Sequence, residues 1–200
     1  MSTPAAAASP ARSRRHDPDR RDHIIDACIE VIAQDGVDGT SHRRVATAAG
    51  VPLGSMTYHF TGRDELLREA LARFAGTVAQ RFAERMSTVP DGDREAGTRA
   101  VIDLILTGVF PDNRELVLTH ELYTLAARDP EYRTITNAWM GQSRSILERV
   151  FDPLTARLLD ALIEGMTIHR ALDSAPHDDG DVEIAVRRIT GQPRSTITLA

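Results

Sequence analysis

The chain has no lysine, a single cysteine and few aromatic residues. All 24 of its basic residues are arginines, and 29 acidic residues give it a net charge of −5. This balance excludes a global electrostatic attraction to nucleic acid, so any such binding must come from a local patch. The lone Cys28 cannot form an internal disulfide, which is typical of the reducing cytoplasm.

Long hydrophobic runs are also missing. No stretch reaches the roughly 18 apolar residues of a membrane span, and the alanines at positions 5–8 are not followed by the apolar core of a signal peptide. Apolar residues make up 42% of the chain and charged residues 26%, which is usual for a globular protein and excludes a disordered chain or a disulfide scaffold. We therefore expect a cytoplasmic protein with no membrane contact.

What the sequence does contain is apolar residues at helical spacing, so the predicted fold class is all-α. Asp35-Gly36 ends the first predicted helix, and Thr40 is the expected cap of the second. Asp129-Pro130 and Asp152-Pro153 each place a capping Asp before a first-turn Pro. The helices are expected at about 20–35, 41–49, 52–60, 63–86, 94–109, 115–128, 130–151, 153–173 and 181–189.

The organisation along the chain follows from these helices. Residues 1–19 lack large apolar side chains and are expected to form a disordered arm, and residues 191–200 a flexible tail. The arm's cluster of Arg12, Arg14 and Arg15 is either a solvated tail or a contact to DNA, as in some helix-turn-helix proteins. Residues 20–66 form one predicted domain, 67–190 a second, and the helix at 63–86 links them.

The most informative segment runs from Val45 to Leu66. Two short helices joined at Ala49-Gly50-Val51 predict a helix-turn-helix, in which Gly50 provides the tight turn. The outer face of the second helix is small, hydroxyl-bearing or aromatic, which suits a DNA major groove, whereas a purely structural helix would more often carry Glu and Arg. Its residues are Leu53, Gly54, Ser55, Thr57, Tyr58 and His59.

This segment resembles the DNA-binding domain of the tetracycline-repressor (TetR) family of bacterial transcription regulators. The matching positions are Val45-Ala46, Ala49-Gly50-Val51, Gly54, Tyr58-His59-Phe60, Arg63 and Glu65-Leu66. The resemblance covers roughly residues 20–70; beyond them the chain matches only in length and helical pattern. Thr57 stands where the family often has Tyr, Arg63 where it usually has Lys, and Pro52 where Ser or Thr is common.

The resemblance implies a set of DNA contacts. Thr40, Arg43 and Arg44 would meet phosphates or groove edges near the start of the second helix. Base edges would be met by Leu53, Gly54, Ser55 and Thr57, and phosphates by Tyr58, His59 and Arg63. The alternatives are ordinary surface packing for Tyr58 and His59, and a solvated face for Arg43 and Arg44.

The resemblance also implies a ligand cavity in the C-terminal half. The expected lining residues are Phe74, Val78, Phe82, Leu104, Gly108, Phe110, His120, Glu121, Tyr123, Thr124 and Trp139. Plain core packing remains the alternative for each apolar member. The pair His120-Glu121 is a weak metal signal, and we predict neither a metal nor a cofactor.

The helix at 153–173 is apolar on nearly all sides, which predicts a two-fold interface. The expected interface residues are Ile146, Val150, Leu158, Ala161, Leu162, Gly165 and Met166. Burial within one subunit is the alternative.

Together these features predict a ligand-responsive transcriptional repressor. It would bind a pseudo-palindromic DNA operator as a homodimer and be released by a small-molecule effector. The alternative is a helical small-molecule-binding protein or enzyme with no role on DNA. The sequence shows no Gly-rich phosphate loop, paired metal motif or nucleophile with a matched base, so we do not expect an enzyme.

Overall fold

The computed structural model describes residues 19–108 and 112–192, and every regular element in those ranges is a helix, as predicted. The predicted arm up to residue 18, Phe110 and the tail from residue 193 lie outside the described residues. The elements in chain order are α1 (Arg20–Gly39), α2 (His42–Ala48), α3 (Gly54–His59), α4 (Arg63–Met86), α5 (Arg94–Thr107), α6 (Asn113–Arg128), α7 (Pro130–Leu147), α8 (Pro153–Leu172) and α9 (Asp179–Thr190).

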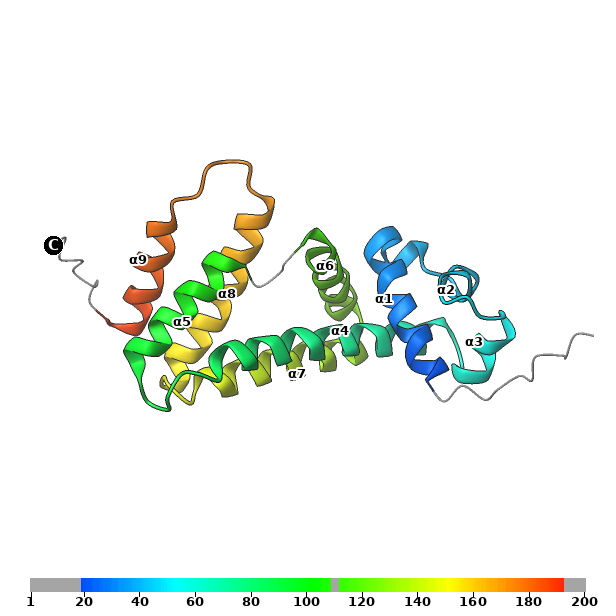
Figure 1. The fold of residues 1–200 in the computed structure, drawn as a ribbon, viewed down its shortest axis with the longest axis horizontal. Helices are drawn as coiled ribbons and strands as arrows, with labels where there is room; N and C mark the ends of the chain where they lie inside the picture. The colour runs from blue at the N-terminus through cyan, green and yellow to red at the C-terminus, as the bar shows by residue number, and fades with distance from the viewer. Residues whose placement is uncertain (1–18, 109–111, 193–200) are drawn as a thin grey trace, which may run out of the picture.

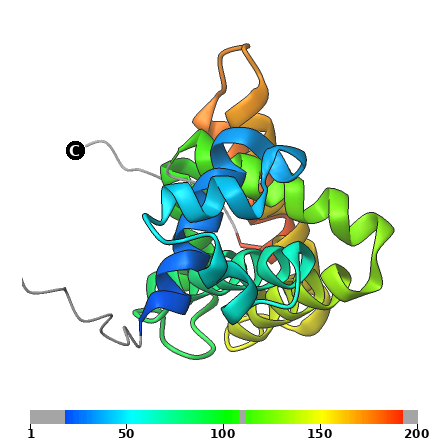
Figure 2. The same cartoon turned by 90° about the vertical axis from the view of Figure 1, so that its right-hand side faces the viewer.

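The molecule is elongated, and α4 runs along its middle (Figure 1). Helices α1, α2 and α3 form one end, whereas α5, α8 and α9 form the other (Figure 1). Helix α7 packs along α4, and α6 packs against both α1 and α7. Figure 2 looks at the α1–α3 end, with the rest of the molecule behind it. The long α4 therefore connects the two ends directly.

Aspartates cap most of the later helices, as the Asp-Pro pairs predict. The Asp129 carboxylate accepts a hydrogen bond from the Glu131 amide at 2.8 Å, and that of Asp152 accepts from the Thr155 amide at 3.0 Å. Each satisfies an amide that has no partner within its helix. Helix α7 ends four residues earlier than expected, where the amides of Arg149 and Val150 donate to carbonyls three residues back, at Ile146 and Leu147, in place of the four-residue spacing of an α-helix.

The turn between α1 and α2 depends on Gly36. This residue breaks the helical path with φ 69° and ψ 174°, and a single further turn follows to Gly39. The expected cap of α2 is wrong by one residue: the Ser41 hydroxyl accepts from the Arg44 amide, while the Thr40 hydroxyl donates to the Gly36 carbonyl at 2.8 Å. Thr40 is buried by this contact, which leaves the neighbouring Ser41 to cap the helix.

Two apolar cores stabilise the structure. The first contains α1, α2, α3 and the first half of α4, and it also takes Leu118 and Leu122 from α6 and Tyr132 from α7. The second joins the end of α4 to α5, α8 and α9. Because α6 and α7 contribute to the first core, the helix-turn-helix end is packed onto the helices that follow it. None of the described helices is long and apolar enough to cross a membrane.

Candidate functional site

The helix-turn-helix forms as the local sequence predicts. Gly50 adopts φ 63°, and the amide of Val51 donates to the Ala46 carbonyl at 3.0 Å. Val45, Ala46 and Met56 are buried on the inner faces of α2 and α3. Helix α3 begins at Gly54, two residues after the expected Pro52, because Pro52 and Leu53 form the turn before it. Because the inner faces of α2 and α3 pack against the core, the opposite face of α3 points outward.

The outward face of α3 has the exposure that a groove contact requires. Tyr58 is 79% exposed and Leu53 50% exposed, so both present their side chains to solvent rather than to the core. Gly54 and Thr57 are also exposed. A Cβ atom at Gly54 would meet no atom of the chain within 4 Å, so internal packing does not require glycine there. The missing side chain instead leaves room for a partner's surface to approach the backbone.

The other expected contacts of this end differ in accessibility. Ser55 and His59 are partly buried, and the His59 ring packs edge-to-face with Tyr58 at a centroid distance of 4.8 Å. Arg43 and Arg44 are exposed at the start of α2, although Arg44 forms an ion pair with Asp35. This end therefore offers two arginines and an aromatic pair beside the outer face of α3.

Thr40 and Arg63 are placed differently from the DNA contacts that the resemblance implies. Thr40 is 2% exposed and hydrogen-bonded within the chain, so its side chain cannot reach a phosphate. The Arg63 guanidinium donates to the carbonyl of Thr40 at 2.6 Å and to that of Val37. It satisfies carbonyls at the end of α1, and so holds the turn before α2 against the start of α4.

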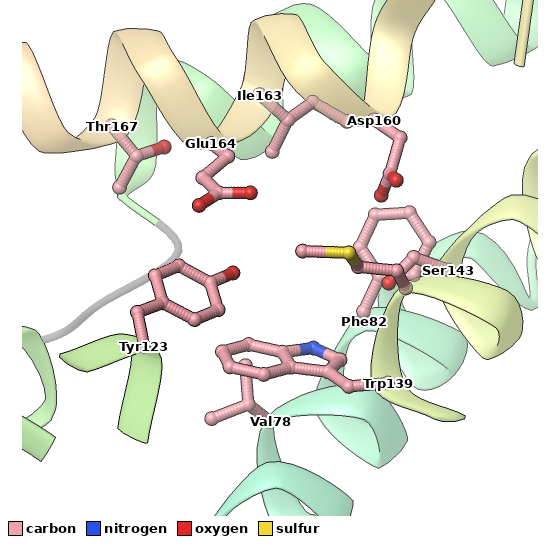
Figure 3. A pocket seen from close by; sticks show the side chains of 10 residues that line it. Val78, Phe82, Tyr123, Trp139, Ser143, Asp160, Ile163, Glu164 and Thr167 are labelled. Carbon is pink, nitrogen blue, oxygen red and sulfur yellow. The ribbon is translucent and has the colours of Figure 1, made fainter. Parts of the chain in front are cut away.

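The C-terminal half contains a pocket where α4, α6, α7 and α8 converge (Figure 3). The cavity between its side chains measures about 50 Å³ and opens to solvent at its mouth. Because small-molecule sites usually have about 300–1,000 Å³, an organic ligand would occupy the mouth as well as the cavity. Its lining residues are Val78, Phe82, Tyr123, Trp139, Met140, Ser143, Asp160, Ile163, Glu164 and Thr167.

Four of the expected ligand residues lie in this lining, namely Val78, Phe82, Tyr123 and Trp139. Phe74 lies behind them, with its ring edge-to-face with Trp139 at 6.1 Å between centroids. Leu104 and Gly108 line a neighbouring cavity, which shares Val78 and Phe82 with the pocket. The side chains of α4 thus separate two adjacent hollows.

Three expected ligand residues lie away from the pocket. His120 and Thr124 are exposed on α6, and the His120 ring binds the Leu116 carbonyl at 2.8 Å. Glu121 packs beside Gly36, where a Cβ atom would lie 2.7 Å from its carboxylate oxygen. Only the face of α6 that carries Tyr123 points into the pocket. No cluster of three or more metal-ligating side chains occurs within the described ranges.

Sequence reasoning missed the contribution of α8 to the pocket, because the helix was interpreted as an interface alone. The missed polar residues of α8 are Asp160, Glu164 and Thr167. Two acidic residues four positions apart in an otherwise apolar helix were the signal that could have found them. They lie on one face of α8, since residues at this spacing are neighbours on a helix.

Burial raises the pKa of two pocket groups. Desolvation raises the pKa of Asp160 to about 6, with Arg144 opposing the shift and Glu164 adding to it. Burial also raises the pKa of Tyr123 above its usual value, and the nearby negative charge of Glu164 contributes. Strongly shifted groups in a concave site are typical of binding or catalytic positions.

The opposite face of α8 carries an exposed apolar stripe. Leu154, Leu158 and Leu172 are exposed, with Leu158 at 48%, and Ala161 and Gly165 lie between them at helical spacing. Leu162, Met166 and Ile146 are partly buried against the second core. Val150 does not fit the expected interface: it is buried within the chain, and its Cγ1 would lie 2.6 Å from a Cβ atom at Gly97.

Comparison with known proteins identifies a domain at each end of the molecule. Residues 24–70 match the family described as bacterial regulatory proteins of the tetR family, and residues 92–192 match the tetracyclin repressor-like C-terminal domain. The regulator SCO7518 of Streptomyces coelicolor A3(2) is 51% identical, with a TM-score of 0.80 over 86% of this chain and 99% of that one.

Two further relatives are known for their ligands. The multidrug binding protein EbrR, in its complex with ethidium, is 35% identical, with a TM-score of 0.70 over 87% of this chain and 99% of that one. The nicotine-responsive repressor HdnoR of Paenarthrobacter nicotinovorans is 33% identical over 57% of this chain and 58% of its own length. The chain thus spans little more than half of HdnoR, but nearly all of EbrR.

These matches cover the helix-turn-helix and the helical domain that holds the pocket. A helical binding protein or enzyme without a role on DNA is therefore not favoured. The chain belongs to the TetR family of bacterial regulatory proteins, and it is a ligand-responsive transcriptional regulator.

Proposed function

We propose that this regulator is a homodimeric repressor, which binds a pseudo-palindromic operator through α3 and is released when a small organic molecule fills the α4–α6–α7–α8 pocket. The observation that carries the proposal is the outward face of α3, with exposed Leu53 and Tyr58 on a helix whose inner face is fully packed. Such a regulator acts at the chromosome, in the bacterial cytoplasm.

The DNA contact is proposed residue by residue. Leu53, Gly54, Ser55 and Thr57 meet base edges, whereas Tyr58, His59, Arg43 and Arg44 lie near phosphates. Arg63 acts indirectly, because its guanidinium holds the carbonyls of Val37 and Thr40.

The exposed stripe of α8 supports the homodimer. One subunit presents one recognition helix, and successive major grooves on one side of DNA lie about 34–36 Å apart, so two subunits are needed to read a palindrome. Leu154, Leu158 and Ala161 form an apolar surface that a second copy of the helix would cover.

Two helices connect the pocket to the DNA-binding end, which supports the proposed release. Helix α4 lines the pocket with Phe82 and begins at Arg63. Helix α6 lines it with Tyr123, while Glu121, two residues earlier, packs beside the Gly36 turn. A ligand that prefers a different placement of either helix would shift α3, whereas a ligand with equal affinity for both states would shift nothing.

Binding of the free protein to DNA from upstream of its own gene tests the proposal. We expect a retarded complex in a mobility-shift assay that survives excess unrelated DNA. Tyr58→Ala should weaken the complex without unfolding the protein. A thermal-shift screen then finds ligands, and titration of each hit against the complex should lower DNA affinity roughly 5- to 150-fold, the range of typical allosteric coupling. Absence of specific DNA binding by the folded protein would refute the proposal.

A further inference from the structure

Helix α8 presents two carboxylates to the pocket, one helical turn apart. Figure 3 shows the Asp160 and Glu164 side chains pointing from α8 toward the cavity, across which the indole of Trp139 lies. Most of the remaining lining is apolar or aromatic, so two acidic groups at one wall are chemically distinct. They belong to the effector pocket assigned above, and the inference below therefore rests on that proposed function.

The negative charge of this wall is only partly balanced. On the α7 side, Arg144 lies 3.9 Å from a carboxylate oxygen of Asp160, at the outer limit of an ion pair. Within the described ranges Glu164 forms no ion pair, and the neutral hydroxyl of Tyr123 from α6 points toward it (Figure 3). Helix α4 contributes only apolar Val78 and Phe82. Both carboxylates are half-buried, and a partly desolvated charge without a full partner costs stability, which a ligand that supplies positive charge recovers.

The pocket also has flat aromatic surfaces. The rings of Tyr123 and Trp139 lie 27° from parallel with centroids 6.2 Å apart, and Phe74 supports the indole from behind. Aromatic faces attract cations, and Trp does so most strongly. They also stack on the rings of a planar ligand. The carboxylates of α8 and the aromatic rings of the pocket therefore favour the same kind of ligand, a planar cation.

Thr167 provides a further polar group. Its side-chain oxygen is buried and has no hydrogen-bond partner, although the residue lines the pocket beside Glu164. Buried hydroxyls are normally paired, because an unmade hydrogen bond costs free energy. With the two carboxylates, it makes the α8 wall rich in acceptors of N–H groups.

We propose that the pocket takes a flat aromatic cation with N–H donors, held against the Trp139 face with its N–H groups toward Glu164, Asp160 and Thr167. Glu164 is the principal charge partner, because it has no competing arginine. Asp160 contributes a second acceptor and shares its charge with Arg144. Anions are excluded by repulsion from the two carboxylates, and neutral analogues bind less tightly because they leave the charge of Glu164 unbalanced.

A pair of fluorescent probes of equal shape tests this proposal. In mildly alkaline buffer 9-aminoacridine is a cation with N–H donors, while acridine is neutral. Fluorescence titration of the full-length protein, without DNA, should show 9-aminoacridine binding roughly tenfold to hundredfold more tightly, as expected for a charge-assisted hydrogen bond. Glu164→Gln should remove most of this preference by weakening only the cation.

Three controls make the result decisive. Glu148→Gln changes an exposed carboxylate at the end of α7 and should leave both affinities unchanged. Far-ultraviolet circular dichroism and the melting temperature verify that Glu164→Gln is folded, and its nearly equal shape makes gross misfolding unexpected. Asp160→Asn provides an independent second variant, with a smaller expected loss of cation affinity because Arg144 shares that charge.

The proposal is overturned if acridine binds as tightly as 9-aminoacridine, if neither binds, or if Glu164→Gln weakens both probes equally. These outcomes are distinct from failure of the proposed function. The binding titration contains no DNA, whereas the mobility-shift assay of the free protein contains no probe, so either can fail while the other succeeds.

Discussion

The two ends of the molecule use polar side chains in opposite ways. At the helix-turn-helix end, one short helix exposes consecutive residues, including Tyr58 and Thr57, on a single outward face. At the pocket, polar groups from three helices meet inside the chain, as Tyr123, Ser143 and Glu164 illustrate. The first arrangement is set by neighbours in the sequence, and the second by packing between distant helices. A local motif can therefore identify the DNA-binding end, but it cannot identify the ligand.

The largest effect on DNA affinity is expected from a substitution that breaks the proposed dimer. Leu158→Arg places a charge in the proposed α8 interface and should convert the dimer to monomers, which analytical ultracentrifugation measures. DNA affinity should fall roughly 10²- to 10⁴-fold, because two linked recognition helices gain this much over one. Val117→Arg is the matched control, since it charges an exposed apolar residue of α6 away from α8. An unmodified protein that sediments as a monomer would contradict the prediction.

The next largest effect on operator binding is expected from a substitution on the exposed face of α3. Tyr58→Ala should weaken operator binding roughly tenfold or more through loss of a phosphate contact in each subunit, while the free energy of unfolding changes by less than about 0.5 kcal/mol. Buried Phe60 provides the contrast: Phe60→Ala should cost about 3–5 kcal/mol of stability. Fluorescence anisotropy and urea denaturation measure the two quantities. A large loss of stability in Tyr58→Ala would show that this end is not purely a binding surface.

Arg63 lies at the junction of the two ends, and Arg63→Ala should have a moderate effect. Loss of its bonds to the Val37 and Thr40 carbonyls should lower the free energy of unfolding by about 1–3 kcal/mol. DNA affinity should fall, yet the slope of log affinity against log salt should stay unchanged, because no phosphate contact is removed. If instead the slope decreases by about one per subunit with stability intact, Arg63 binds phosphate directly.

The smallest effect concerns the pocket. The pKa of Asp160 is raised to about 6, so the folded state binds its proton more tightly than the unfolded state. The contribution of Asp160 to stability should therefore be greatest in acid and decline as the pH rises from about 4 through about 6, by on the order of 1–3 kcal/mol. Asp160→Asn should remove this contribution. Melting temperatures across that pH range, compared between the two proteins, measure the difference; identical profiles would contradict the assignment.

Much of the fold could be predicted because its signals are local. Asp129-Pro130 and Asp152-Pro153 start α7 and α8 as expected, and Gly36 interrupts α1. The errors lie where burial in the folded chain, rather than residue type, decided between neighbours: Thr40 is 2% exposed with its hydroxyl bonded to Gly36, which left Ser41 to cap α2.

The pocket was less predictable for the same reason. Aromatic residues such as Tyr123 and Trp139 could be proposed from their helical positions, but so could His120 and Thr124, which face solvent. Periodicity identifies the buried side of α6 without specifying which neighbour covers each residue. Asp160 and Glu164 could be located only after α8 was placed against α7 and α6.

The helices, the Asp caps of α7 and α8 and the family could all be read from the sequence, because helix periodicity, capping and the helix-turn-helix motif involve residues within a few positions of one another. Helix packing was needed to show that Arg63 holds the end of α1, that Val150 packs inside the chain, and that the carboxylates of α8 face Trp139. These contacts join residues from different helices, and the direction in which each helix turns its faces is set by the packing of the whole bundle.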